Sequence, residues 1–372
     1  MNRPLHPLYG ADPATLTRLM ACYGPPDSAY AGTLAAAAAS AAARLPNTGL
    51  EAAVDRWTTV PVEAPVFILG HWRSGTTHLF NLLSAGGSVA HATPVSVGLP
   101  WDFRLLGRAV APVLRRAIPS ERGIDGMAVT PSSPQEDEIA LASMTVPSYY
   151  HGVYFPRHFS AAMTAGLFFD RCSDRDRSRW QSALRRFTGK VAAQGQGAEV
   201  LIKNPAHTSR VAVIREVWPN ARFIHIVRDP HAVLQSTRRM FGRLLDMLAL
   251  QRADPEVVDA TILATYPRMM DALIADTADL PPERYAEVRF EDLEQQPLTE
   301  VHRVASQIGI GDIDAVMTGA ERQLSRVAGY HKQTQEVPPE VARTVAERWL
   351  PQLAHWGYQR RDNGGAEGGS TC

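Results

Sequence analysis

Short apolar runs alternate along the chain with stretches of helical spacing. Residues 66–69 form the first run, and a continuous apolar segment of this kind is typical of a parallel strand buried on both faces. Similar runs follow at residues 200–202, 223–227 and 287–290, and helical patterns separate the runs at 178–193, 208–217 and 232–250. Strands that alternate with helices predict an α/β fold with a central parallel sheet flanked by helices.

The first 60 residues lack this strand pattern. They read as helical and alanine-rich, with the pattern punctuated at Pro25, Pro26, Pro46 and Gly49. A membrane-crossing helix needs about 20 strongly apolar residues. The alanine-rich stretch over 29–45 does not supply them, because Ser40 and Arg44 interrupt it. We expect a helical segment that serves in packing or in contacts between copies of the chain, as in a homo-oligomer, without a transmembrane span.

The sheet pattern also disappears over residues 95–175, where aromatic residues are frequent. Most of them should form core, and the alternative is that several line a binding pocket, since such pockets are mostly apolar. The glycine-rich C-terminal tail is expected to be disordered. The expected organisation is a helical segment over 1–60, a main domain over 61–360 that includes the helical insertion over 95–175, and a disordered tail over 361–372.

Charge and cysteine content exclude several classes of protein. Thirty-eight basic residues balance thirty-eight acidic ones, which argues against a partner such as nucleic acid, so any anion site must be local. The cysteines Cys22, Cys172 and Cys372 have no metal-ligand spacing and predict free thiols in a reducing compartment. Because the first residues also lack the pattern of a secretory signal, we expect a cytoplasmic protein.

The segment after the first predicted strand reads GHWRSGTT over residues 70–77 and precedes a helical pattern. Its glycines let the backbone turn tightly, successive N–H groups point inward, and the helix N-terminus adds a dipole that favours an anion. The spacing matches the Walker A loop at Gly70 and Gly75, but Thr76 stands where that loop has its lysine, and the available cation is Arg73. The missing lysine argues against ATP as the ligand.

A second polar cluster follows the run at 223–227, where the chain reads FIHIVRDPHAVLQST. Asp229 suits a helix N-cap and Pro230 suits the first helical position, so the helix should begin just after Arg228. An arginine at this place can bind a phosphate bidentately, as a lysine cannot. Ser236 follows Arg228 by eight residues, on the predicted helix.

Together these segments resemble sulfotransferases that depend on 3'-phosphoadenosine 5'-phosphosulfate (PAPS). GHWRSGTTHL is similar to the family's 5'-phosphosulfate loop, in the bacterial branch that carries arginine in place of lysine. FIHIVRDPHAVLQST is similar to the family's 3'-phosphate site, where an arginine and a serine hold the phosphate. The resemblance implies a P-loop-like sheet and a donor site that includes Arg73, Ser74, Gly75, Thr76, Thr77, Arg228 and Ser236.

Three weaker matches extend the resemblance. Lys203, in LIKNPAH, is similar to a family lysine that faces the sulfuryl group. Phe290, in VRFEDLEQQP, stands near the adenine where a tyrosine is common, so stacking could persist while the hydroxyl contact is lost. Lys332, in YHK, is placed like the basic residues that fold over the 3'-phosphate in relatives.

The resemblance implies in-line, metal-independent transfer of a sulfuryl group from PAPS to a hydroxyl, with 3',5'-adenosine bisphosphate as the product. We expect Arg73 and Lys203 to supply positive charge where the leaving phosphate develops negative charge. The acceptor would be a small molecule, a lipid or a glycan, and the aromatic residues favour the first two. A polyanionic acceptor or a solvated helix face would each account for Arg104, Arg108, Arg115, Arg116 and Arg122.

The group that accepts the hydroxyl proton remains open. Related enzymes with an arginine-type loop often have a glutamate at a position that here falls in HATPVSVG, which contains no carboxylate. The segment SSPQEDEIAL is similar to one in bacterial members and offers Glu136 as the general base. Asp137, His151 and His207 are alternatives, and Asp137 could instead hold a histidine in place. A competing interpretation makes residues 136–138 a solvated helix N-terminus.

Two other functions fit part of the pattern. A P-loop kinase or nucleotide hydrolase is opposed by Thr76 and by the lack of an apolar strand that ends in an obvious magnesium-binding aspartate. A non-catalytic nucleotide-binding module is opposed by the presence of Arg73, Lys203, Arg228 and Ser236, although the unassigned base leaves it open.

Overall fold

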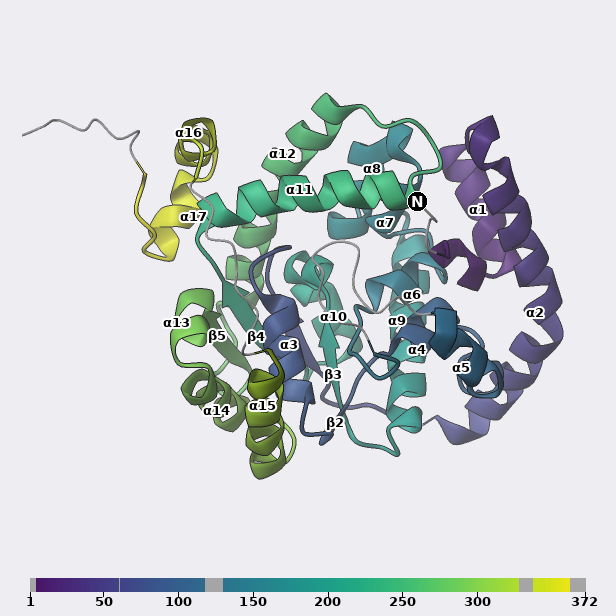
Figure 1. The fold of residues 1–372 in the computed structure, drawn as a ribbon, viewed down its shortest axis with the longest axis horizontal. Coiled ribbons are helices and arrows are strands. Elements are labelled where there is room, and N and C mark those ends of the chain that lie inside the picture. Colours follow the sequence, from purple (N-terminus) through teal and green to yellow (C-terminus); the bar gives the residue numbers. More distant parts are fainter. Residues whose placement is uncertain (1–4, 60, 118–129, 328–336, 362–372) are drawn as a thin grey trace, which may run out of the picture.

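The computed structural model describes residues 5–59, 61–117, 130–327 and 337–361. Within these ranges the centre is a parallel sheet of five strands in the order β2-β3-β1-β4-β5 (Figure 1). The strands are β1 (Val66–Leu69), β2 (Val89–Ala90), β3 (Glu199–Lys203), β4 (Arg222–Val227) and β5 (Tyr285–Arg289). The predicted α/β fold with its parallel sheet is thereby confirmed. Strand β2 escapes the sequence analysis, because two residues are too few to show a period.

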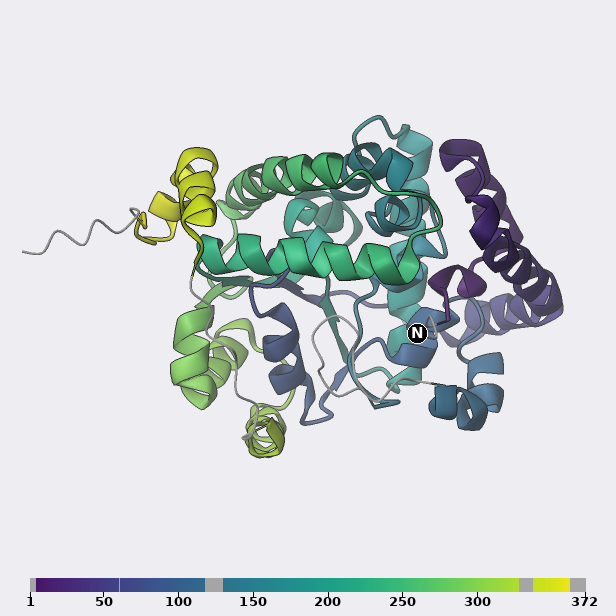
Figure 2. The same cartoon turned by 45° about the horizontal axis from the view of Figure 1, so that its top comes forward.

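Helices cover both faces of the sheet, which explains why its strands are continuously apolar (Figure 2). Val66 and Ile68 of β1 point into the core on one face, whereas Phe67 and Leu69 point into the core on the other. The first face packs against α3 (Thr76–Ser84), α14 (Pro297–Ile308) and α15 (Ile313–Val327). The second packs against α9 (Asp174–Gln194), α10 (Val211–Val217), α11 (Pro230–Leu248) and α12 (Pro255–Thr277).

The N-terminal part contains α1 (Pro13–Tyr23) and the long helix α2 (Ala31–Thr58), which lies at the edge of the molecule (Figure 1). Contrary to the sequence analysis, α2 runs through Pro46 and Gly49 without a break. Buried polar contacts hold the helix on both sides of Pro46. Before it, Arg44 pairs with Asp102. After it, Glu51 pairs with Lys190 of α9 at 2.7 Å, and both side chains are fully buried. Tertiary contacts therefore override the local helix-breaking signal.

The aromatic-rich region folds into short helices. They are α4 (Pro94–Gly98), α5 (Leu106–Ala117), α6 (Glu138–Ala142), α7 (Tyr150–Tyr154) and α8 (Phe159–Phe168). Most of its aromatic side chains are buried in the core, among them Phe103, Tyr149, Tyr150, Tyr154, Phe155 and Phe159. The interpretation of these residues as core is therefore confirmed. Within the described ranges, no helix combines the length and apolar character that crossing a bilayer requires.

The last described helices are α13 (Phe290–Gln295), α16 (Pro339–Arg348) and α17 (Leu350–His355). Directly after α17, Trp356 donates from Nε1 to Glu287 of β5 at 3.0 Å. The same Glu287 oxygen accepts from His225 of β4 at 2.9 Å and from the Tyr285 hydroxyl at 3.2 Å. Burial alone would raise the pKa of Glu287, but these donors lower it to about 2. One ionised carboxylate thus joins the C-terminal segment to two strands.

Replacing Glu287 by glutamine tests this junction. Because the folded pKa of about 2 lies below the ordinary value of 4.5, the carboxylate stabilises the fold above pH 4.5 and loses that effect as the pH falls toward 2. The side chain is 37% exposed, so we expect Glu287→Gln to cost only about 1 to 2 kcal/mol at pH 7. Urea unfolding at pH 7, 5 and 3 should show the difference shrinking with pH; a constant difference would contradict this account.

Candidate active site

The loop between β1 and α3 turns sharply through two glycines. Gly70 has a φ of 144°, and a Cβ there would lie 2.6 Å from the carbonyl oxygen of Ile226. Gly75 has a φ of 100°, and a Cβ there would run into the ring of Phe290. Both positions require the absence of a side chain, as the sequence analysis expects of a phosphate-binding loop.

Polar contacts fix this loop against the sheet. The Gly70 N–H donates to the Thr208 hydroxyl at 2.8 Å, and the Ser74 hydroxyl donates to the carbonyl of His71 at 2.7 Å. Helix α3 then begins at Thr76, and its N-cap residue, Gly75, has no side chain to accept from the first-turn N–H groups. These N–H groups and the helix dipole form an anion-binding position at the end of β1.

Arg228 meets the loop because β4 pairs in parallel with β1. Its Nη1 donates to the carbonyl oxygen of Arg73 at 3.0 Å. Arg73 in turn donates from Nε to the Ser236 hydroxyl at 2.9 Å. The Arg228 guanidinium lies 4.3 Å from the centre of the Phe290 ring, and burial lowers the pKa of Arg228. Four of the expected donor-binding residues therefore form one continuous cluster.

Helix α11 begins as the sequence analysis expects. Asp229 is its N-cap residue, with Oδ1 accepting from the His231 N–H at 2.9 Å, and Pro230 occupies the first helical position. Phe290, in contrast, begins α13 and does not end β5. Lys332 lies outside the described residues, as do Arg122 and residues 362–372 of the tail.

Lys203 ends β3 and faces the loop from the other side. Its Nζ donates to Glu136 Oε1 at 2.5 Å and to the Thr77 hydroxyl at 3.2 Å. The side chain of Lys203 is 2% exposed and that of Glu136 is 14% exposed. The Tyr149 hydroxyl donates to the other Glu136 oxygen at 3.4 Å. The structure thus brings together a cation, a partly exposed carboxylate and the first turn of α3.

The other two carboxylates of the 136–138 run are buried. Asp137 accepts from His207 Nε2 at 2.9 Å, and Glu138 forms a two-point ion pair with Arg210 at 2.7 and 3.0 Å. Burial alone would raise the pKa of Glu138, but Arg210 holds it below the ordinary value. The solvated helix N-terminus is therefore wrong for Asp137 and Glu138, because both are engaged in the interior. The alternative role for Asp137, holding a histidine, is confirmed.

The histidines near the loop are fully or almost fully buried. His151 faces the carbonyls of Val146 and Ala142 at 2.5 and 2.8 Å, and burial lowers its pKa. His71 packs edge-on against Trp72 and Tyr266, and burial lowers its pKa to about 3, so it is neutral at physiological pH.

The sequence analysis does not predict several of the polar residues that lie in this region. Thr208, Asn204 and Arg210 all follow Lys203 within one short segment, which includes a 3-10 turn over Pro205–Ser209. Their polar side chains are completely buried. The signal available in the sequence is a dense polar group directly after a buried strand, but spacing alone does not show which partners these side chains have.

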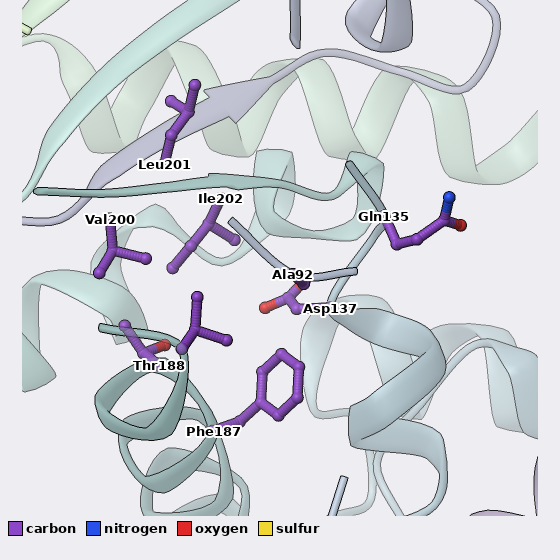
Figure 3. A pocket seen from close by; sticks show the side chains of 9 residues that line it. Ala92, Gln135, Asp137, Phe187, Thr188, Val200, Leu201 and Ile202 are labelled. Carbon is purple, nitrogen blue, oxygen red and sulfur yellow. The ribbon is translucent and has the colours of Figure 1, made fainter. Parts of the chain in front are cut away.

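A small cavity lies between β3 and α9 (Figure 3). Its volume of about 10 Å³ is room for about one water molecule and not for an acceptor. Asp137 and Thr188 both border it. In the described part of the chain, no three His, Cys, Asp or Glu side chains converge so that they could hold a metal ion.

The comparisons with known proteins agree with this geometry. A model of the sulfotransferase family matches residues 65–314. The chain is 31% identical over 302 residues to the omega-hydroxy-beta-dihydromenaquinone-9 sulfotransferase Stf3 of Mycobacterium bovis, which covers 81% of this chain and 77% of that relative. Stf3 of Mycobacterium tuberculosis matches with the same identity and the same coverage.

Two solved structures share the fold. Sulfotransferase STF9 from Mycobacterium avium superposes with a TM-score of 0.65 at 12% identity, over 95% of this chain and 88% of that one. Sulfotransferase STF1 from Mycobacterium tuberculosis superposes with a TM-score of 0.62 at 15% identity, over 91% and 90%. With the glycine loop, the basic strand ends and the family match in agreement, the chain belongs to the sulfotransferase family.

Proposed function

We propose that this protein transfers a sulfuryl group from PAPS to the hydroxyl of an apolar acceptor. One observation carries the proposal: Arg228 bonds to the backbone of Arg73, and the Arg73 side chain reaches Ser236, at 3.0 and 2.9 Å. The loop expected to hold the 5'-phosphosulfate and the residues expected to hold the 3'-phosphate are therefore neighbours. Two neighbouring anion sites suit the two phosphate-bearing ends of one nucleotide.

In the proposed donor site each residue has a distinct part. The N–H groups and hydroxyls of Ser74, Thr76 and Thr77 bind the 5' end at the start of α3. Arg228 and Ser236 bind the 3'-phosphate, for which a guanidinium is well shaped. Phe290 supports Arg228 from one ring face.

The proposed chemistry uses Glu136, Lys203 and Arg73. The acceptor oxygen attacks sulfur in line, the bond from sulfur to the bridging oxygen of the 5'-phosphate breaks, and the hydroxyl proton passes to the Glu136 carboxylate. Lys203 and Arg73 stabilise the negative charge that develops on the leaving phosphate, an effect typically worth about 3 to 4 kcal/mol per donor. Among the four candidate bases, Glu136 is favoured because Asp137, His151 and His207 are buried in other contacts.

The proposed acceptor carries its hydroxyl on an apolar chain. The relative named for omega-hydroxy-beta-dihydromenaquinone-9 suggests a hydroxyl on an isoprenoid chain. A panel with labelled PAPS should include geranylgeraniol, a simple phenol and a desulfated glycan. Transfer to the prenyl alcohol above the other two supports the proposal, and a clear preference for the glycan would contradict it.

The donor can be identified without knowing the acceptor. We expect 3',5'-adenosine bisphosphate at about 100 times its Kd to stabilise the protein by roughly 2.7 kcal/mol in thermal unfolding, and ATP with magnesium to give little shift. Stabilisation by ATP and magnesium alone would instead favour a P-loop kinase or hydrolase.

Arg228→Ala should weaken bisphosphate binding by about 10- to 100-fold, because a charge-assisted hydrogen bond is worth roughly 1.5 to 3 kcal/mol. Isothermal titration calorimetry would measure this loss. The matched control is Arg252→Ala, an exposed arginine on the loop before α12, which should bind as the unmodified protein does. Equal affinities for both variants would refute the 3'-phosphate assignment.

Glu136→Gln separates binding from transfer. The amide retains the size of the carboxylate but cannot take the proton, so kcat should fall by about a hundred- to ten-thousandfold. The thermal shift with bisphosphate should be retained. Glu321→Gln, at an exposed position of α15, is the control and should leave kcat unchanged. A non-catalytic module would show no transfer in any of these proteins.

A further inference from the structure

The three carboxylates at 136–138 have different partners. Glu136 contacts Lys203, whereas Asp137 and Glu138 both contact Asn204, the residue next to Lys203. We infer that Asn204 is a positioning residue, which holds this run so that the Glu136 carboxylate faces the end of β3. The inference rests on the proposed role of Glu136 as proton acceptor. Nothing in the site chemistry described above depends on Asn204 itself.

Asn204 bridges two successive carboxylates. Its Nδ2 donates to Asp137 Oδ1 at 2.8 Å and to Glu138 Oε2 at 2.7 Å. Its Oδ1 accepts from the Ala206 N–H at 2.9 Å, which fixes the amide in this orientation. The side chain is completely buried, and each of its polar atoms has a partner. Rotation of the amide would place an oxygen against two carboxylates, so the arrangement has one orientation.

Each carboxylate bonded to Asn204 is held from a second side. His207 Nε2 holds Asp137 at 2.9 Å. Arg210 holds Glu138 and also donates from Nε to the Gly166 carbonyl at 2.7 Å. Buried charges that lose such partners are costly, so the backbone on the C-terminal side of Glu136 has little freedom to shift.

Lys203, the last residue of β3, and Asn204, the residue after it, together contact the whole run. Lys203 contacts Glu136, and Asn204 contacts Asp137 and Glu138. Because Lys203 and Asn204 are consecutive, these contacts set the register between β3 and the carboxylate run. A displacement of about 1 Å at a reacting group can cost about a hundredfold in rate.

Packing does not provide this register by itself. The Asp137 side chain borders the small cavity between β3 and α9, as does Thr188 (Figure 3). Among the described residues, the Thr188 hydroxyl has no hydrogen-bond partner. Asp137 is therefore not closely surrounded on that side, and its hydrogen bonds to Asn204 and His207 define its place.

Asn204→Ala is the direct test, with 35S-labelled PAPS as donor and geranylgeraniol as acceptor probe. We expect kcat to fall by about a hundredfold while the Kd of 3',5'-adenosine bisphosphate changes less than about twofold. The matched control is Gln251→Ala, which removes another buried amide, one that binds the carbonyls of Tyr23 and Pro25. The control should retain kcat. A folded Asn204→Ala protein with unchanged kcat would overturn the inference.

A double variant that combines Asn204→Ala with Glu136→Gln tests the positioning role of Asn204 separately from the role of Glu136 as base. If Asn204 acts through Glu136, Asn204→Ala should reduce kcat by less than about threefold once the carboxylate is absent. Losses that multiply would overturn the positioning role and leave the base assignment intact. Full turnover in Glu136→Gln alone would instead refute the base assignment.

His207 supplies a test that survives if Asn204→Ala fails to fold. A glutamine can place its amide near the position of Nε2 and still donate to Asp137, whereas leucine cannot. We expect His207→Gln to retain kcat within about threefold and His207→Leu to lose about tenfold or more, with bisphosphate binding equal in both. An undiminished kcat in both variants would contradict the need for the Asp137 contact, whereas a similar loss in both would overturn it in favour of His207 as the base.

Discussion

Parallel hydrogen bonding of β1 to both β3 and β4 brings the carboxyl ends of three strands to one edge of the sheet. One polar element lies at each of these strand ends: the glycine loop follows β1, Lys203 ends β3 and Arg228 follows β4. Ligands in open α/β sheets bind at such an edge for this reason. The site is thus a consequence of strand order, and the loop conformation at Gly70 and Gly75 completes it.

Within the described residues, the interior contains buried ion pairs. Arg210 with Glu138, and Lys190 with Glu51, are pairs in which both side chains are fully buried. Such pairs contribute little net stability compared with apolar packing, but removing one partner leaves a buried charge. Each pair therefore disfavours any conformation that would separate its two side chains.

The sequence predicts the features that depend on local pattern. The apolar runs predict four strands, Asp229 and Pro230 predict the start of α11, and the two glycines predict the loop. Contacts between distant segments are not visible in this way. The burial of Asp137 and Glu138 depends on Asn204 and Arg210, which are far from them in sequence. In the same way, the continuity of α2 through Pro46 depends on Asp102 and Lys190. A single sequence does not show which of its distant residues are in contact.

The ion pair between Glu51 and Lys190 crosses the boundary of the recognisable family region. The family match begins at residue 65, so Lys190 lies inside it and Glu51 lies outside. Lys190 also donates to the carbonyls of Pro100 and Trp101 at 2.9 and 2.8 Å, but these are neutral acceptors. A shortened chain that starts at the family boundary would leave the buried Lys190 without the Glu51 carboxylate. Helix α2, which precedes the matched region, therefore supplies the charge that balances Lys190 inside it.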